Sequence, residues 1–452
     1  MARNLKRIGQ QARKDEKTRF TSIYHFVTDV DHLRASYEEI EGNSAPGVDG
    51  VTKEEYGGQL EENLRELADR LGRMGYKPQP VKRVYIPKPG SQKKRPLGIP
   101  CFEDKVVQMA LTRVLEQIYE TDFIEGSFGY RPGRTQHDAL DELGRTIQQK
   151  KANYVVEADI KGFFDHVNHE WLMKMLEVRI GDKRVLRLVA RMLKGGVFED
   201  GLIRASEEGV PQGGNLSPLL SNVYLHYALD LWFERVFRKT CRGEAYYFRY
   251  ADDFLLCFQY REDAERFLTE LEGRLGKFHL EVEPSKTQLI EFGRFAEKNA
   301  DGRGGKPGTF DFLGFTHYCG QTRNGAFKVK RMTSKKKFRA KLSEVKAWLK
   351  QERNHVKTGE LLQRGKQILE GHLNYYAITD NGRMCDEYRR QVSRLLFKWL
   401  NRRSQRRSYT WERFKGALAW VRWPSVRIQH KLDPFRRGEP RWVRVKQIAF
   451  CF

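Results

Sequence analysis

The stretch Tyr246–Tyr260, YYFRYADDFLLCFQY, places two adjacent carboxylates between two apolar and aromatic runs. Runs rich in Phe, Tyr and Leu are typical of β-strands, so the stretch predicts a hairpin with Asp252 and Asp253 at its turn. Two carboxylates this close repel each other, and a divalent cation shared with a third ligand would relieve that repulsion. An exposed turn, in which aspartate is common, is the structural alternative.

A second strand-like run, Tyr154–Ile160 (YVVEADI), carries another carboxylate, Asp159, near its end. Three carboxylates on two neighbouring strands are the ligands that a two-metal phosphoryl-transfer site needs. Such a site holds its cations about 3.5–4 Å apart, where they stabilise both the attacking and the leaving oxygen. The pattern therefore indicates nucleotidyl or phosphoryl transfer rather than an ordinary turn.

The order of these motifs resembles that of the reverse transcriptases encoded by group II introns, the intron maturases. Besides the acidic strands, the resemblance rests on Pro211–Pro218 (PQGGNLSP) and Gly371–Tyr376 (GHLNYY), and it runs from about Gly42 to about Arg403. It implies an α+β fold of the right-hand polymerase type, with fingers, palm, a basic helical thumb and a C-terminal extension.

The resemblance also implies template-directed DNA synthesis with RNA as the main template. Asp159, Asp252 and Asp253 would be the catalytic residues and would hold two Mg²⁺ ions, with Mn²⁺ as a substitute. One ion would lower the pKa of the primer 3′-hydroxyl group, and the other would neutralise charge on the triphosphate and pyrophosphate. The implied partners are dNTPs, an RNA template with a DNA primer, target DNA, and group II intron RNA or another structured RNA.

Five residues match positions that contact the incoming nucleotide in the resembled family. A basic hairpin within 81–100 would direct two cationic side chains to the triphosphate, and a ring beneath the sugar would clash with a 2′-hydroxyl and so favour dNTPs. A glutamine would position the nucleotide, and a lysine would act on the leaving pyrophosphate. A solvated hairpin, a core Phe and a surface Lys are the alternatives. The residues are Lys88, Arg95, Phe164, Gln212 and Lys286.

The template and primer contacts implied by the resemblance lie in three loops. Two arginines of SFGYRPGRTQHDA would reach a backbone phosphate, the PQGG loop would lie against the templating base, and FDFLGF would grip the primer end. The last segment could equally be a plain core strand. The residues are Arg131, Arg134, Pro211, Gly213, Leu313 and Gly314.

The resemblance and the pattern of elements divide the chain into five regions. We expect an N-terminal extension (1–75), fingers (76–153), a palm (154–328) with finger-derived helices within 170–205, a thumb or maturase region (329–403), and a basic Trp/Arg-rich C-terminal extension (404–452).

Positive charge is concentrated in the last quarter of the chain. Residues 331–452 contain 31 Lys and Arg against 10 Asp and Glu, whereas residues 1–330 contain 52 against 49. This asymmetry indicates a polyanionic partner, with RNA as the leading candidate and an anionic membrane surface as the alternative. The expected RNA-binding residues are Lys335, Lys336, Lys337, Arg402, Arg403, Arg406 and Arg407.

The remaining features exclude several classes of protein. No apolar run is long enough to cross a bilayer, and the basic N-terminus lacks the apolar core of a secretory signal. None of the six cysteines forms a CxxC pair, which argues against a zinc ribbon or a redox dithiol. We expect a bacterial cytoplasmic protein, associated with the nucleoid when bound to DNA. We also expect no HNH endonuclease domain of the kind that many relatives carry, since the cysteines lack its spacing, and therefore no target-strand nicking.

Three functions fit these observations. The first is a reverse transcriptase that also binds its parent intron RNA to assist splicing and retrohoming. The second is an RNA-binding splicing factor that makes little use of its polymerase site, although the intact carboxylates and Phe164 argue against a dead site. The third is a freestanding reverse transcriptase in host repair or defence, which would share the same polymerase motifs.

Overall fold

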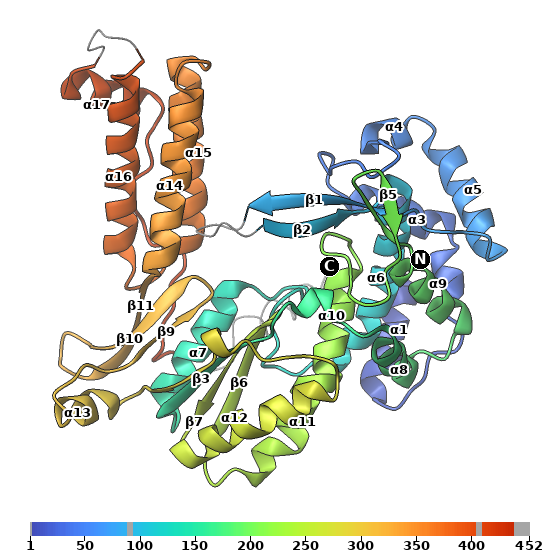
Figure 1. Cartoon of the computed structure of the whole chain (residues 1–452), viewed down its shortest axis with the longest axis horizontal. Coiled ribbons are helices and arrows are strands. Elements are labelled where there is room, and N and C mark those ends of the chain that lie inside the picture. Colours follow the sequence, from blue (N-terminus) through green and yellow to red (C-terminus); the bar gives the residue numbers. More distant parts are fainter. Residues whose placement is uncertain (1, 88–93, 404–408, 438–452) are drawn as a thin grey trace.

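The computed structural model describes residues 2–87, 94–403 and 409–437. Figure 1 shows three regions in a row: a mostly helical N-terminal region in blue, a central region built on a β-sheet, and a group of long orange and red helices. These regions take the places of fingers, palm and thumb. The expected α+β right-hand fold is therefore confirmed.

The central sheet has four antiparallel strands in the order β6–β7–β3–β8. Residues along β7 alternate between two cores: Phe254 and Leu256 pack in one, and Leu255 and Cys257 pack in the other. Because both faces are covered, this strand is apolar throughout rather than alternating. The strands are β3 (Tyr154–Asp159), β6 (Ala245–Tyr250), β7 (Asp253–Phe258) and β8 (Gln288–Glu291).

Helices cover both faces of this sheet. On one face α12 (Arg261–Gly276) packs against β3 and β7, and on the other α7 (Gln136–Gln149) packs against β6. Thr135 begins α7 with a capping box, in which its hydroxyl and the Asp138 carboxylate bond each other's backbone N–H groups. A second segment covers the same face of the sheet as α12. It consists of α10 (Ser217–Leu225), the π-helical η2 (His226–Asp230), α11 (Leu231–Arg235) and the 3-10 turn η3 (Phe237–Thr240).

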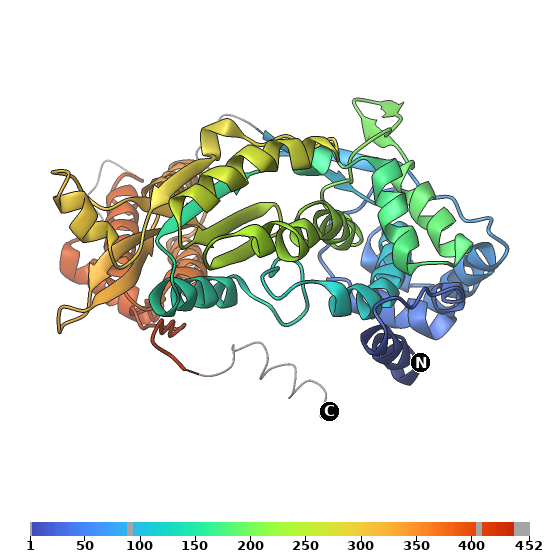
Figure 2. The ribbon, with the colours of Figure 1, turned by 90° about the horizontal axis from the view of Figure 1, so that it is seen from below.

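The fingers are organised around one long helix, α6 (Phe102–Asp122), most of which is buried. Seven further helices belong to this region, and the first four of them pack directly against α6. Figure 2 shows the last two at the fingers end, although they follow the first palm strand in sequence. These helices are α1 (Ala2–Lys14), α2 (Tyr24–Val27), α3 (Val30–Glu39), α4 (Lys53–Gly57), α5 (Leu60–Gly72), α8 (His169–Arg179) and α9 (Lys183–Leu193).

A second four-stranded sheet, ordered β2–β1–β4–β5, reaches from the fingers toward the thumb (Figure 1). Its first pair is the basic hairpin expected from the sequence. A parallel pairing between β1 and β4 attaches a second hairpin that follows α9. The strands are β1 (Val81–Pro87), β2 (Lys94–Ile99), β4 (Val197–Glu199) and β5 (Leu202–Arg204).

A three-stranded sheet joins the palm to the thumb, and four helices complete the thumb. Ser334 caps the first of these helices by accepting a hydrogen bond from the Lys337 backbone N–H. The second and third of these helices pack against each other through buried residues, among them His372, which stacks on Tyr388. The elements are β9 (Thr309–Phe312), β10 (Phe315–Gln321), β11 (Phe327–Thr333), α14 (Lys335–Glu352), α15 (Thr358–Tyr376), α16 (Gly382–Leu400) and α17 (Trp411–Trp420); the short helix α13 (Ala296–Asp301) precedes them.

The segment after α17 runs back along the thumb to the palm. The His430 ring stacks on His137 of α7 at a centroid distance of 3.7 Å, and Leu432 is buried. Arg436 forms an ion pair of 2.9 Å with Asp141 of α7. The segment after α17 is thus packed against both the thumb and α7.

Candidate active site

The register of the palm sheet brings the three carboxylates to one end of it. Asp159, the last residue of β3, lies directly opposite Asp253, the first residue of β7. Ala251 and Asp252 form the turn between β6 and β7, and Ala251 has a positive φ of 58°. A tight turn and one cross-strand pair therefore gather residues that are separated by more than 90 positions in the sequence.

The protein around this end of the sheet disfavours the ionised form of the Asp252 and Asp253 carboxyl groups. Part of the Asp253 side chain is open to solvent, but the surrounding protein atoms disfavour its charged form, and the charges of Asp252 and Asp159 add to this effect. The pKa of Asp253 is therefore raised to about 7. The pKa of Asp252 is also raised, mainly by burial, while the Arg95 and Lys286 charges act in the opposite direction.

The donor set suits a hard divalent cation, because it consists of carboxylate oxygens. Among residues 2–87, 94–403 and 409–437, no three acidic, His or Cys side chains already enclose a point that could hold an ion. At this centre the Lys286 ammonium group donates to Asp159 Oδ2. The raised pKa values of Asp252 and Asp253 fit a site that gains from added positive charge, and an ion bound by all three carboxylates would compete with Lys286.

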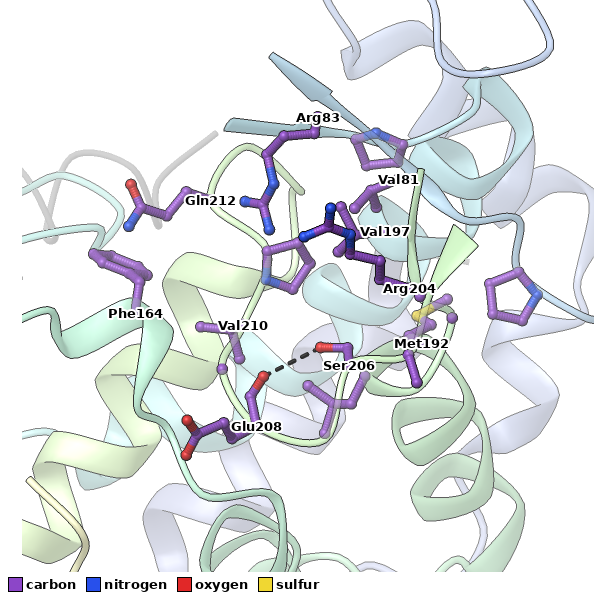
Figure 3. Close-up of a pocket in the computed structure, with 18 of the residues that line it drawn as sticks. Val81, Arg83, Phe164, Met192, Val197, Arg204, Ser206, Glu208, Val210 and Gln212 are labelled. Atoms are coloured by element: carbon purple, nitrogen blue, oxygen red, sulfur yellow. Dashed lines mark hydrogen bonds between the residues drawn. The ribbon is translucent and has the colours of Figure 1, made fainter. Parts of the chain in front are cut away.

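Phe164, Pro211 and Gln212 line one cleft of about 340 Å³ between the fingers and the palm. Figure 3 shows Phe164 and Gln212 at the same end of this cleft, with Arg83 of β1 on its wall. Phe164 belongs to the 3-10 turn η1 (Phe163–Asp165), and its carbonyl accepts a 2.8 Å hydrogen bond from the Val210 N–H. This bond fixes the PQGG loop beside the ring.

The PQGG loop is also attached to the basic hairpin. The Gly98 N–H of β2 donates to the Gln212 carbonyl at 2.7 Å. Gly213 has a φ of 118°, and a Cβ there would lie 2.9 Å from the Gly98 carbonyl oxygen. Only glycine meets both conditions without strain. The loop therefore connects the fingers sheet to the Phe164 ring.

Two cationic residues expected at the nucleotide lie near the carboxylates. Arg95 is exposed on β2, and its charge lowers the pKa of Asp252. Lys286, on the 3-10 turn η4 (Pro284–Lys286), contacts Asp159 directly. Lys88 lies outside the described residues.

Arg131 and Arg134 both hold the loop before α7. The buried Arg131 guanidinium forms an ion pair with Glu120 and donates to the carbonyls of Ile124 and Ser127. Arg134, which is partly exposed, donates to the Ser127 carbonyl and to that of Glu125. Their expected contact with a template phosphate stays a prediction.

The expected primer-gripping turn lies next to the thumb. Leu313 and Gly314 both have positive φ, of 49° and 80°, and form the turn between β9 and β10. The Tyr375 hydroxyl donates to the Leu313 carbonyl at 2.8 Å. The Asp253 charge contributes to the raised pKa of Tyr375, after burial and neighbouring tyrosines, so the turn is close to the end of the sheet that carries the carboxylates.

The expected RNA-binding residues fall into separate groups. Lys335, Lys336 and Lys337 are exposed in the first turn of α14, and the Lys337 charge lowers the pKa of Asp253, so this turn lies near the carboxylates. Arg403 instead donates to Thr358 Oγ1 and the Val356 carbonyl, which ties α16 to α15. Arg402 is exposed and lies over the Trp399 ring. Arg406 and Arg407 lie outside the described residues.

Sequence reasoning missed the charged residues beneath the catalytic turn, Arg249 and Asp230. Both are completely buried, and they form an ion pair. The available signal was an arginine within the otherwise apolar strand YYFRY, because a buried charge requires a partner.

Three carboxylates at one end of the palm sheet, a cleft between fingers and palm, and a thumb beside them are the arrangement of the right-hand class of nucleic-acid polymerases. Residues 86–317 match the family described as reverse transcriptase (RNA-dependent DNA polymerase), and residues 335–423 match the group II intron, maturase-specific domain. The first match covers more than half of the chain, which therefore belongs to the reverse transcriptase family. This family generally uses divalent metal ions.

Several relatives are encoded by introns. The chain is 37% identical over 222 residues to the group II intron-encoded protein LtrA of Lactococcus lactis, which covers 49% of this chain and 37% of LtrA. It is 33% identical over 317 residues to the protein YkfC of Escherichia coli K12, which covers 63% of this chain and 83% of YkfC. A 97-residue segment is 35% identical to nuclear intron maturase 1, mitochondrial, of Arabidopsis thaliana, covering 21% of this chain and 13% of that protein. The chain thus spans little more than a third of LtrA.

No helix among the described residues is both long enough and apolar enough to cross a membrane.

Proposed function

We propose that this protein is an RNA-directed DNA polymerase that copies RNA into cDNA by two-metal phosphoryl transfer. The observation that carries the proposal is the meeting of Asp159, Asp252 and Asp253 at one end of the palm sheet. The cleft that contains Phe164 and Gln212 supports it, because it provides a place for a nucleotide between fingers and palm.

In this proposal the three carboxylates hold two Mg²⁺ ions, for which Mn²⁺ can substitute. When bound, these ions supply Lewis-acid activation of the primer hydroxyl and neutralise charge on the phosphates. Arg95 and Lys88 hold the triphosphate by charge-assisted hydrogen bonds. Lys286 leaves Asp159 for the phosphates when the nucleotide arrives, and stabilises the departing pyrophosphate.

Selection of the nucleotide falls to the cleft. The Phe164 ring lies under the sugar and leaves no room for a 2′-hydroxyl, so dNTPs are preferred. Gln212 and the adjoining backbone of Pro211 and Gly213 support the nascent base pair. The Leu313–Gly314 turn holds the primer end, and the lysines of the first α14 turn contact the backbone of the primer–template duplex.

Primer extension on an RNA template with Mg²⁺ tests this proposal. We expect extension with dNTPs and little with rNTPs. The Asp252→Asn/Asp253→Asn variant is the control, because it keeps the shape of the turn but removes two of the charges, and it should extend no primer. Wild-type protein that binds RNA tightly yet extends no primer would refute polymerase activity and favour the splicing factor.

A second function, binding of the parent group II intron RNA to assist splicing and retrohoming, is supported by the maturase-specific match and by the thumb surface. The Trp420 side chain on α17 is 71% exposed, which suits stacking on an unpaired base. Target DNA is a further partner of retrohoming. In this setting the protein works in the cytoplasm and joins the nucleoid when bound to DNA.

The two functions are separable in one experiment. The Asp252→Asn/Asp253→Asn variant should still promote splicing of the parent intron, because RNA binding by the thumb does not need the carboxylates. Loss of splicing in this variant, with the fold retained, would contradict the separation.

A further inference from the structure

Arg249 and Asp230 form an ion pair directly beneath the catalytic turn. Neither side chain is accessible to solvent, and two parallel hydrogen bonds of 2.6 and 2.8 Å join the guanidinium to the carboxylate. The Tyr247 hydroxyl donates to the same carboxylate at 2.8 Å. Well-packed apolar side chains often stabilise a core as well as a buried ion pair does, so stability alone does not account for this pair.

The third nitrogen of the Arg249 guanidinium, Nη1, is directed at the turn between β6 and β7. Arg249 Nη1 donates to the Ala251 carbonyl oxygen at 3.0 Å and to Asn222 Oδ1 at 2.8 Å. Ala251 has a left-handed backbone conformation, which costs energy for any residue with a Cβ. Its carbonyl belongs to the peptide plane that leads into Asp252. The hydrogen bond from Arg249 therefore fixes the plane from which Asp252 projects.

The loop before α7 supports the same turn from the other side. Asn222 Nδ2 donates to the Gly129 carbonyl at 2.7 Å. A Cβ at Gly129 would lie only 2.2 Å from the Ala251 backbone nitrogen, so this close approach requires glycine. The backbone of Arg249 also bonds to Gly126 and Phe128. The turn is thus held between the guanidinium and the 126–129 segment.

The position of Asp230 depends on an irregular helix. Asp230 ends the π-helical segment η2, which separates α10 from α11. One additional residue in a helix rotates the following side chains by about 100°, and such π-helical turns are frequent at functional sites. A regular α-helix through the same sequence would direct Asp230 away from Arg249.

We propose that Arg249, oriented by Asp230 and Asn222, is a positioning residue that holds the Ala251–Asp252 turn in the conformation in which Asp252 and Asp253 bind divalent cations. The inference rests on the proposed polymerase function for its activity readout. Its metal-binding readout is independent of that function.

The test is the Arg249→Lys variant, which keeps the positive charge but cannot reach Asp230, Asn222 and Ala251 together. Isothermal titration of the protein with Mn²⁺, without nucleic acid, should show an affinity lowered about tenfold. In primer extension the Mg²⁺ concentration for half-maximal rate should rise by a similar factor, and saturating Mg²⁺ should restore much of the rate.

A matched control exists in the fingers. Asp122 and Arg179 form another buried ion pair, at 3.2 Å between Asp122 Oδ2 and Arg179 Nε, which joins α6 to α8. The Asp122→Asn variant should lower the melting temperature to a similar extent as Arg249→Lys but leave both metal readouts at their wild-type values.

Two results would overturn the inference. One is wild-type Mn²⁺ affinity and Mg²⁺ requirement in Arg249→Lys. The other is an equal loss of metal affinity in Asp122→Asn, which would make the effect one of general stability. If Arg249→Lys does not fold, Asn222→Ala takes its place, because it keeps the ion pair and removes one acceptor of Arg249 together with the bond to Gly129. Wild-type protein that binds Mn²⁺ but extends no primer would refute polymerase activity, while the titration would still decide the role of Arg249.

Discussion

Replacing Phe164 by valine should weaken discrimination between dNTPs and rNTPs. The Phe164 side chain is only 8% exposed, and it lines the cleft that also contains Gln212. The 2′-hydroxyl of an rNTP would clash with the ring, and an rNTP for which the ring shifts aside would still bury that hydroxyl without a hydrogen-bond partner, which costs about 1–3 kcal/mol. Because 1.4 kcal/mol corresponds to a factor of ten, the ring should contribute roughly 5- to 150-fold to discrimination. Valine removes most of the ring and should remove most of that factor.

The assay is single-nucleotide incorporation on an RNA template, with kcat/KM measured for one dNTP and the matching rNTP. The ratio of the two is the readout, because it cancels a general loss of active protein. Phe163→Val is the matched control: Phe163 is adjacent and buried, and its ring packs edge-on against Phe164 at 5.3 Å. It should lower stability without changing the ratio. An unchanged ratio in Phe164→Val, or an equal change in Phe163→Val, would refute the assignment of Phe164 as the sugar selector.

Three further outcomes are expected. The pKa of Asp253 is raised from 3.8 to about 7. Between these pH values the folded protein keeps a proton on Asp253 that the unfolded chain has lost. The ion-free protein should therefore lose stability as the pH rises from about 4 to 7. Thermal unfolding in EDTA should therefore show Asp253→Asn melting above the wild type at pH 8 but not at pH 4, and identical pH profiles would contradict this. Trp420→Ala should weaken binding of the parent intron RNA about tenfold, because it removes roughly 1–3 kcal/mol of base stacking, and it should not slow primer extension on a simple template. Filter binding measures the first effect and an extension assay the second. A parallel loss in both would contradict an intron-specific role. Arg131→Gln should cost about 1–3 kcal/mol in the free energy of unfolding, because it removes the bonds of the buried guanidinium to the Ile124 and Ser127 carbonyls and leaves the partly buried Glu120 without its partner. Denaturant titration measures that cost, and a stable variant whose template binding has a reduced salt slope would instead make Arg131 a phosphate contact.

The features that could be predicted from the sequence are those that depend on neighbouring residues. The apolar run of β7 and the adjacent carboxylates predicted a hairpin, and the register of the sheet brought Asp159 to it. The resemblance predicted a basic helical thumb, and the long helices α14, α15 and α16 follow the palm in the structure. The PQGG motif was expected to lie against the templating base, which stays a prediction; the close approach that the structure shows is the one between Gly213 and Gly98 of β2.

The features that sequence reasoning missed depend on exposure and on distant partners. Arg131 and Arg95 were both expected to contact phosphate groups, yet Arg131 is buried and pairs with Glu120, whereas Arg95 is exposed on β2 near Asp252. Nothing in the local sequence distinguishes them. In the same way, Arg403 is one of a cluster of arginines that suggests RNA binding, but the packing of α16 against α15 makes its guanidinium part of the thumb.

The contact between the last described segment and α7 has a consequence for the order of folding. Arg436 and Asp141 are almost three hundred residues apart in sequence, and Gln149 donates to the carbonyls of Pro434 and Arg436. Contacts of such long sequence separation form late, because the intervening chain must first be made and ordered. A ribosome that has completed the thumb helices therefore carries a nascent protein in which α7 still lacks its contacts with residues 430–436. A newly made molecule passes through a stage in which its three carboxylates can be in place while its last described segment is not yet packed on α7.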